Sequence, residues 1–265
     1  MAIVNVTPDS FYSGSRNLSA EDVGQRVRRA VGEGATILDI GGYSSRPGAA
    51  EVSLEEEWRR VDMGLAAARR IAPDAAVSVD TFRSEIVRRA VDRWGAIIVN
   101  DISAGELDAE MLAAVAELGL PYIAMHMRGT PASMQQLTDY RRDIVSEVTD
   151  YFRSKIEEMT SAGIERHNII LDPGFGFAKT LEQNYELMHS LDRLVALGYP
   201  VLSGISRKSM IYRLLDITPE ESLCGTAVLN WVSLEKGASI LRVHDVREAV
   251  QVVKMFETYD KYRHI

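Results

Sequence analysis

Residues 36–42 read TILDIGG, and this short run of apolar, β-prone residues is followed by an amphipathic stretch that begins near Ser53. The same order, a short apolar run and then a longer stretch with helical spacing, recurs along the whole chain. Most of the runs are continuously apolar, as expected for parallel strands that are covered on both faces. The eight runs are residues 2–7, 36–42, 76–80, 97–101, 122–126, 168–173, 201–206 and 239–245.

Capping residues mark the starts of two predicted helices. Ser53 and Glu56 have the spacing of a capping box, and Thr218 and Glu221, with Pro219 between them, have the same spacing. The alternation continues without a Pro/Gly-rich linker or a change in composition, so it predicts an α/β fold, a single (β/α)8 TIM barrel that occupies residues 1–265 as one domain. An open doubly wound sheet remains an alternative, because periodicity does not distinguish a closed sheet from an open one.

The composition indicates a soluble, globular protein. The chain has 265 residues, 46% of them hydrophobic, and a formal net charge of −8. No run of 18 apolar residues predicts a membrane span, and no basic patch predicts a nucleic-acid partner. The first residues lack the features of a secretion signal, so a cytoplasmic location is expected. One cysteine, Cys224, predicts neither an intramolecular disulfide nor a metal cluster.

Polar residues concentrate at the C-terminal ends of the predicted strands, where a parallel barrel carries its active site. Asp80, Asn100 and Asp172 offer carboxylate and amide groups that suit the donor-rich edge of a guanidine-like heterocycle such as a pterin. A second set can carry positive charge and predicts a phosphorylated ligand: Arg46, Arg207, Lys208, Arg242 and His244.

Two segments match nucleotide-binding motifs only in part. Residues 174–179 have Lys179 where a dinucleotide fingerprint needs its third glycine, and residues 204–209 have Arg207 where a P-loop needs glycine. The sequence therefore favours neither a Rossmann site nor a Walker A site. No cysteine or histidine pair has zinc-binding spacing.

Seven short motifs occur in order along the chain: 5–11 (NVTPDSF), 42–49 (GYSSRPGA), 79–81 (VDT), 99–101 (VND), 172–177 (DPGFGF), 206–209 (SRKS) and 242–245 (RVHD). Each alone is a weak signal. Together they resemble the ordered motifs of the dihydropteroate synthases, a family of pterin-binding TIM barrels, over nearly the whole chain.

The resemblance implies a transferase of folate biosynthesis. Such an enzyme condenses 6-hydroxymethyl-7,8-dihydropterin diphosphate with 4-aminobenzoate and releases 7,8-dihydropteroate and pyrophosphate, by an SN1-like reaction that Mg²⁺ assists. It also implies a sulfonamide target and a homodimer that pairs through helices near the C-terminus, such as residues 220–236 and 246–259.

The resemblance further implies a role for each site residue. The pterin ring would be held by Asp80, Asn100, Asp172 and Lys208. The diphosphate would be held by Asn5, Arg242 and His244, with Asn5 also a ligand of Mg²⁺. The catalytic set is then Asn5, Asp80, Lys208, Arg242 and His244. The aminobenzoate would be bordered by Phe11, Ser45, Arg46, Pro47, Phe177 and Ser209.

The chain departs from the family pattern in places. Ser13 stands where an acid is usual, and Tyr43 and Ser45 stand where Glu and Thr are usual. The sequence begins directly on the first strand, so the segment that usually precedes it is expected to be absent.

Two other functions remain open at this point. A pterin-binding methyltransferase that serves a corrinoid protein would share the barrel and the pterin acids, but it has no use for a diphosphate site. A pterin-binding barrel without turnover would keep the same residues, and only an assay with both substrates would separate it from a synthase.

Overall fold

The computed structural model describes residues 1–7, 19–44 and 51–262, and within them eight strands alternate with helices. Strands form where the apolar runs were predicted, although most are shorter than the runs. They are β1 (Ala2–Asn5), β2 (Ile37–Gly41), β3 (Ala76–Asp80), β4 (Ile98–Asp101), β5 (Tyr122–Met125), β6 (Ile169–Asp172), β7 (Leu202–Ser203) and β8 (Ile240–Leu241).

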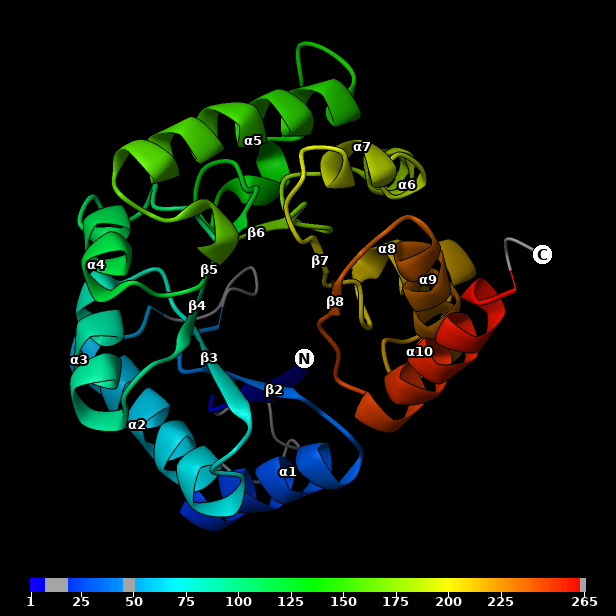
Figure 1. The fold of residues 1–265 in the computed structure, drawn as a ribbon. Coiled ribbons are helices and arrows are strands. Elements are labelled where there is room, and N and C mark those ends of the chain that lie inside the picture. Colours follow the sequence, from blue (N-terminus) through cyan, green and yellow to red (C-terminus); the bar gives the residue numbers. More distant parts are fainter. Residues whose placement is uncertain (8–18, 45–50, 263–265) are drawn as a thin grey trace.

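The helices form a ring outside the strands (Figure 1). They are α1 (Ala20–Gly32), α2 (Leu54–Ile71), α3 (Ser84–Trp94), α4 (Met111–Leu118), α5 (Ile144–Ser161), α6 (Leu181–His189), α7 (Asp192–Val195), α8 (Ser209–Leu215), α9 (Leu223–Glu235) and α10 (Val246–Asp260). Short 3-10 turns at Met134–Gln136 and Arg166–Asn168 precede α5 and β6.

The strands make a closed parallel barrel. Strands β1 to β6 pair in sequence order, and β7 pairs with β8. Isolated parallel bridges join Leu171 to Val201 and Ala2 to Val243, so they connect β6 with the β7 strand segment and β8 with β1. The predicted (β/α)8 TIM barrel is confirmed, and the open doubly wound alternative is wrong.

The strand register places predicted site residues side by side. Asn5 is opposite Gly41, Gly41 is opposite Asp80, and Asp80 is opposite Asn100. These four residues therefore form one row across β1 to β4, at the C-terminal ends of the strands. In a parallel barrel this is the end at which the loops that carry the chemistry meet.

Apolar side chains between the strands and the helices form the core that fixes this register. Leu38 and Ile40 of β2 and Val61 and Leu65 of α2 are fully buried in it. Gly64 allows α2 to approach the sheet, because a Cβ at this position would lie 2.4 Å from Cγ2 of Ile40. The helix and the strand are thus held at a close and defined distance.

Of the two predicted capping boxes, the one at Ser53 forms only its N-cap half, because the Glu56 carboxylate binds Arg59 and Arg60 instead. Ser53 is the N-cap of α2, and its hydroxyl accepts a hydrogen bond from the Glu56 amide. At Thr218 the predicted helix start is wrong: Glu221 accepts hydrogen bonds from the amide and hydroxyl of Thr218, but α9 begins later, after Ser222. Pro219 and Glu221 stabilise a turn ahead of the helix instead.

Across the described ranges, no helix combines the length and the apolar character needed to cross a membrane.

Candidate active site

Arg242 joins three strands at the centre of the barrel mouth. It directly follows β8, and its Nε donates to Oδ2 of Asp39 on β2 at 2.7 Å. Its Nη2 donates to Oδ2 of Asp80, the last residue of β3, at 2.6 Å. Both acids act on the guanidinium, and their negative charges raise the pKa of Arg242 against the lowering effect of burial. The side chain is therefore a fixed positive charge.

The carboxylate of Asp80 lies in a crowded acidic environment. Burial raises its pKa to about 7, the charge of Arg242 opposes that rise, and the carboxylate of Asp39 adds to it. Asn100 lies next to Asp80 in the row, and its Nδ2 donates to both oxygens of Asp39, at 3.2 and 3.4 Å. Asp39 thus holds Arg242 and Asn100 at once.

Asp172 and Lys208 form the other side of the site. Asp172 ends β6, and its Oδ1 accepts the Gly174 amide at 2.8 Å. Burial raises the pKa of Asp172, while the charge of Lys208 opposes the rise. Burial lowers the pKa of Lys208 to about 8, with the charge of Asp172 opposing the fall and the charge of Arg242 adding to it. A carboxylate and an ammonium group are therefore held near each other where water is largely excluded.

Asn5 and His244 lie on the β1 and β8 side of the mouth. Gly41 lets Asn5 approach Asp80: a Cβ on Gly41 would lie 3.2 Å from Oδ1 of Asn5 and 3.7 Å from Oδ2 of Asp80. Oγ of Ser206 lies 3.1 Å from both the backbone nitrogen and Nδ1 of His244. Burial and the nearby charge of Arg242 lower the pKa of His244 to about 3, so its ring is neutral at physiological pH.

The expectation that Arg207 belongs to the anion-binding cations is wrong. Its Nε and Nη2 donate to the two oxygens of Asp245, both at 2.8 Å, and its Nη1 donates to the carbonyls of Pro219 and Glu220. The guanidinium therefore ties α10 to the turn before α9. Lys208, grouped by charge with the same cations, lies instead beside Asp172, as the family resemblance implies.

Of the residues predicted to border the aminobenzoate, the structure describes Phe177 and Ser209. Phe177 lies beneath Lys208, whose Nζ is 4.7 Å from the ring centroid. Ser209 is the first residue of α8 and lines a cavity of about 300 Å³ together with Thr138, Lys179, Thr180 and Met210. Phe11, Ser45, Arg46 and Pro47 lie outside the described residues, and their assignment to the aminobenzoate stays a prediction.

Asp39 and Lys179 were not among the predicted site residues. Asp39 is within an apolar strand, where a fully buried acid signals a fixed partner, but nothing in the sequence says which partner. Lys179 was noted only as a departure from a nucleotide motif. Burial lowers its pKa to about 7, and its Nζ lies 3.0 Å from Nδ1 of His126.

Among the described residues, no three His, Cys, Asp or Glu side chains are grouped so as to hold a metal ion. A magnesium ion does not need such a cage, because it commonly binds one or two protein oxygens together with substrate phosphates and water. The amide oxygen of Asn5, at the mouth and close to Arg242's partner Asp80, fits that mode of binding.

The arrangement can bind a flat polar heterocycle and an anion together. Carboxylates and the amide of Asn100 offer acceptors and donors to the ring edge, and hydrogen bonds of this kind gain strength where water is excluded. Within the described part of the chain, the hydrogen bonds of the Arg242 guanidinium are those made by Nε and Nη2.

The protonation of Lys208 leads to a first prediction. If its ammonium form binds the pterin ring that the family resemblance implies, kcat/KM for that pterin should fall about tenfold per pH unit above about pH 8, because this parameter reports groups of the free enzyme. A pH profile from 6.5 to 9.5 measures this, and a Lys208→Met variant separates titration of the lysine from titration of the substrate. A profile for the unmodified enzyme that stays flat up to pH 9.5 would contradict the assignment.

Comparisons with known proteins give a consistent result. The family model described as "Pterin binding enzyme" matches residues 1–244. The dihydropteroate synthase of Escherichia coli K12 is 44% identical over 259 residues, which are 97% of this chain and 90% of that protein.

Solved structures are similar over the same extent. The Yersinia pestis dihydropteroate synthase, in a complex with a sulfonamide drug, has a TM-score of 0.92 at 38% identity, and the match covers 98% of this chain and 93% of that one. The Xanthomonas albilineans dihydropteroate synthase with 4-aminobenzoic acid has a TM-score of 0.89 at 38% identity. This match covers 98% of this chain and 92% of that one.

Proposed function

Since this chain belongs to the pterin-binding enzymes and, among them, to the dihydropteroate synthases, we propose that it joins 6-hydroxymethyl-7,8-dihydropterin diphosphate to 4-aminobenzoate with release of pyrophosphate. It is a transferase of folate biosynthesis. The methyltransferase alternative does not fit this membership.

One observation supports the full reaction most strongly. Arg242 is fixed by Asp39 and Asp80 through Nε and Nη2, and its guanidinium is the cation proposed to face the diphosphate. A preorganised cation of this kind stabilises negative charge that grows on a leaving group, without having to reorganise during the reaction. Asp80, one of the two acids that hold it, is also proposed to bind the pterin ring.

The proposed roles of the other residues follow from their chemistry. Asp172 accepts hydrogen bonds from the amino edge of the pterin, and Asn100 and Lys208 bind its remaining polar atoms. His244, with its neutral ring held by Ser206, donates one hydrogen bond to the diphosphate.

The bond between the pterin methylene and the diphosphate oxygen breaks first, in an SN1-like step. The arylamine nitrogen then attacks the methylene and loses its proton to water or to the departing diphosphate. An aromatic amine is neutral and nucleophilic at pH 7, so no strong base is needed. Phe177 and Ser209 border the bound 4-aminobenzoate.

We also propose a magnesium ion that binds the amide oxygen of Asn5 and the substrate phosphates. When bound, it would neutralise charge on the leaving diphosphate. Removal of Mg²⁺ with a chelator should then lower kcat by at least about 10²-fold, the scale of losing one strong electrostatic contact. Replacement of Asn5 by leucine should raise the Mg²⁺ concentration needed for half-maximal rate.

The matched measurement is the affinity for 6-hydroxymethylpterin, which has no phosphate. Isothermal titration calorimetry should show that Asn5→Leu leaves this affinity within about threefold, a difference of well under 1 kcal/mol. Full activity in the presence of excess chelator would remove magnesium from the proposal.

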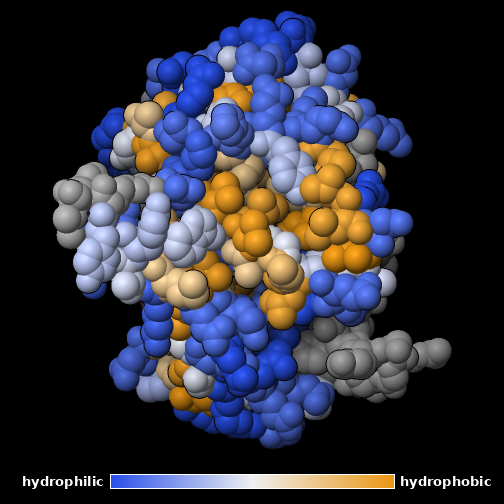
Figure 2. All heavy atoms as spheres, turned by 90° about the vertical axis from the view of Figure 1, so that its right-hand side faces the viewer, coloured by the Kyte–Doolittle hydropathy of each residue, from blue (hydrophilic) through white to orange (hydrophobic). Residues whose placement is uncertain are grey.

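A homodimer is the remaining part of the proposal. Figure 2 shows apolar side chains gathered in the middle of the face that carries α8, α9 and α10. Val228 on α9 and Met255 and Tyr259 on α10 are each more than half exposed there. Trp231 of α9 packs against Phe256 and Tyr259 of α10 at ring-centroid distances of 5.4 Å. These contacts hold α9 and α10 together as one continuous surface. Exposed apolar patches of this kind mark interaction sites.

Sedimentation velocity tests the dimer. The unmodified protein should sediment as a dimer at micromolar concentrations, and the double variant Val228→Asp and Met255→Glu should sediment as a folded monomer, because a charge in the centre of an apolar interface is costly. A monomeric unmodified protein would contradict the proposed dimer. A dimer that survives both changes would place the interface on another surface.

A further inference from the structure

The loop between β6 and α6 has an unusual backbone that needs support from its surroundings. Gly174, Gly176 and Ala178 all have positive φ angles, of 66°, 81° and 51°. Gly174 cannot be replaced without a clash, because a Cβ there would lie 2.1 Å from the carbonyl oxygen of His126. The loop therefore lies directly on the end of β5, and its shape is set by what binds its carbonyl groups.

Lys179 supplies much of that support. The residue is only 4% exposed. Its Nζ donates to the carbonyls of Gly174 at 3.0 Å and Phe177 at 2.9 Å, and it lies 3.0 Å from Nδ1 of His126. An ammonium group has three hydrogens and no acceptor, so these three contacts match its bonding capacity. Both ends of the Gly174–Phe177 turn are held by this one atom.

Other contacts hold the rest of the loop. Oδ1 of Asn184 accepts the Gly176 amide at 2.6 Å, and the hydroxyl of Tyr140 donates to the carbonyl of Ala178 at 2.9 Å. Lys208 donates to the carbonyl of Phe175, which lies between the two carbonyls that Lys179 binds. The two lysines thus bind the same turn, Lys208 at the carbonyl of Phe175 and Lys179 at the carbonyl of Phe177, and a shift of that turn would move Phe177 with it.

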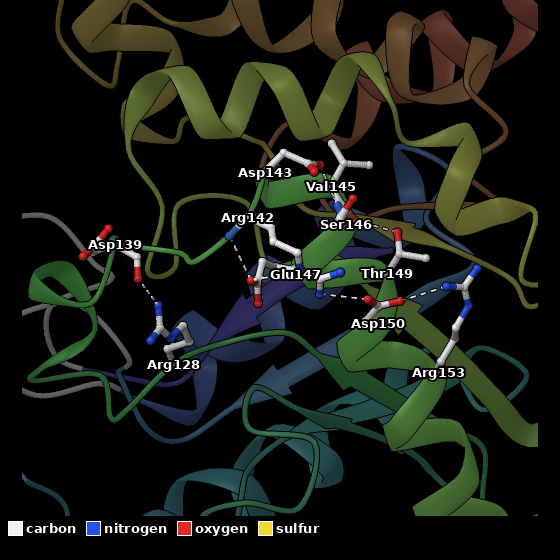
Figure 3. Close-up of polar contacts among 10 residues, drawn as sticks. All are labelled: Arg128, Asp139, Arg142, Asp143, Val145, Ser146, Glu147, Thr149, Asp150 and Arg153. Carbon is white, nitrogen blue, oxygen red and sulfur yellow. Dashed lines mark hydrogen bonds and ion pairs between the residues drawn. The ribbon is translucent and has the colours of Figure 1, made fainter.

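The segment after β5 is itself fastened to its surroundings (Figure 3). Nη1 of Arg128 donates to the carbonyl of Asp139 at 2.7 Å, and its guanidinium lies 4.7 Å from the ring centroid of Tyr140. Arg142 binds Asp150 on the first turns of α5 at 2.8 Å. Tyr140 is therefore presented to the loop from a fixed position, and Lys179 is the buried charged part of the same support.

Lys179 also faces the side of the site at which the arylamine is proposed to bind. It lines the cavity of about 300 Å³ that Ser209 lines. Phe177, whose carbonyl it binds, stacks beneath Lys208. A change at Lys179 would therefore reach Phe177 and the cavity wall directly. Among the described contacts, the pterin-binding Asp172 interacts with Lys179 through charge and not through a hydrogen bond.

From this geometry we infer that Lys179 is a positioning residue for 4-aminobenzoate, which acts by holding the Gly174–Phe177 turn and with it the ring of Phe177. The inference rests on the proposed function. His126 takes part as the third acceptor, because without it the Lys179 ammonium would have an unpaired donor.

Steady-state kinetics with both substrates test this inference. Lys179→Met keeps the length of the side chain and removes its donors, and it should raise KM for 4-aminobenzoate at least about tenfold, or about 1.4 kcal/mol. The Kd for the pterin diphosphate, measured without 4-aminobenzoate, should stay within about threefold. Lys261→Met, at an exposed lysine, is the matched control and should change neither value.

Substitutions at His126 provide a second and gentler test. Asparagine places an acceptor close to the position of Nδ1, whereas leucine has none. His126→Asn should therefore keep KM for 4-aminobenzoate within about threefold, and His126→Leu should raise it toward the Lys179→Met value. This pair remains informative if Lys179→Met does not fold.

The outcomes separate this inference from the proposed function. An unmodified enzyme that makes no dihydropteroate would overturn the proposed function itself. An active unmodified enzyme whose Lys179→Met and His126→Leu variants lose thermal stability but keep KM for 4-aminobenzoate would overturn the inference alone. Equal losses of affinity for both substrates would do the same, because they would show a general effect on the fold.

Discussion

The enzyme should lose about 10³-fold in kcat/KM when Arg242 is replaced by methionine, the upper range for removal of one strong transition-state contact. The replacement removes the cation proposed to face the leaving diphosphate. It also leaves the carboxylates of Asp39 and Asp80 without their shared partner. Because the charge of Arg242 opposes the rise in the pKa of Asp80, its loss would raise that pKa further and favour the protonated acid at neutral pH.

The measurement is steady-state kinetics with saturating 4-aminobenzoate, alongside circular dichroism to confirm folding. Arg153→Met is a suitable control, because Arg153 lies on α5 with its side chain 63% exposed and makes its described ion pair with Asp150. A folded Arg242→Met variant with less than a tenfold loss would show that this guanidinium does not carry the proposed role.

Replacement of Asp39 by asparagine should have the second largest effect, although Asp39 is not proposed to touch either substrate. Its carboxylate holds Nε of Arg242 and the amide of Asn100, and it is fully buried. Loss of its charge leaves a buried ion pair incomplete, which typically costs about 3 kcal/mol of unfolding free energy. We expect kcat/KM to fall about 10²-fold as well, because two substrate-binding groups lose their common anchor.

Urea unfolding and kinetics on the same preparations check both parts of this expectation. Asp139→Asn serves as the control, since the Asp139 side chain is exposed and only its carbonyl oxygen is described as bonded to Arg128. An Asp39→Asn enzyme with normal stability and normal kcat/KM would mean that Asp80 alone is enough to orient Arg242.

The sequence predicted the barrel well because each strand is a local apolar run and each helix shows apolar residues at helical spacing. The ends of the elements were less predictable. The runs 201–206 and 239–245 contain strands of only two residues, Leu202–Ser203 and Ile240–Leu241, because pairing in this part of the barrel depends on bridges between distant segments. No local pattern reports such pairing.

The site was predictable to the extent that its residues lie at strand ends. Asp80, Asn100, Asp172 and Arg242 meet at the barrel mouth because parallel strands bring their C-terminal ends together. The pairing of charges was not predictable, since it depends on which side chain reaches which partner in space. Arg207 binds Asp245, and Arg242 binds Asp39, and neither pair follows from spacing along the chain.

The most direct test of the proposed reaction is the stoichiometry of its products. Purified enzyme, 6-hydroxymethyl-7,8-dihydropterin diphosphate, 4-aminobenzoate and Mg²⁺ would be incubated together, and pyrophosphate and dihydropteroate would be measured in the same samples. We expect one pyrophosphate for each dihydropteroate, with dihydropteroate formation that requires both substrates and is lost in Arg242→Met. A folded enzyme that binds the pterin but forms no dihydropteroate would contradict the proposed reaction.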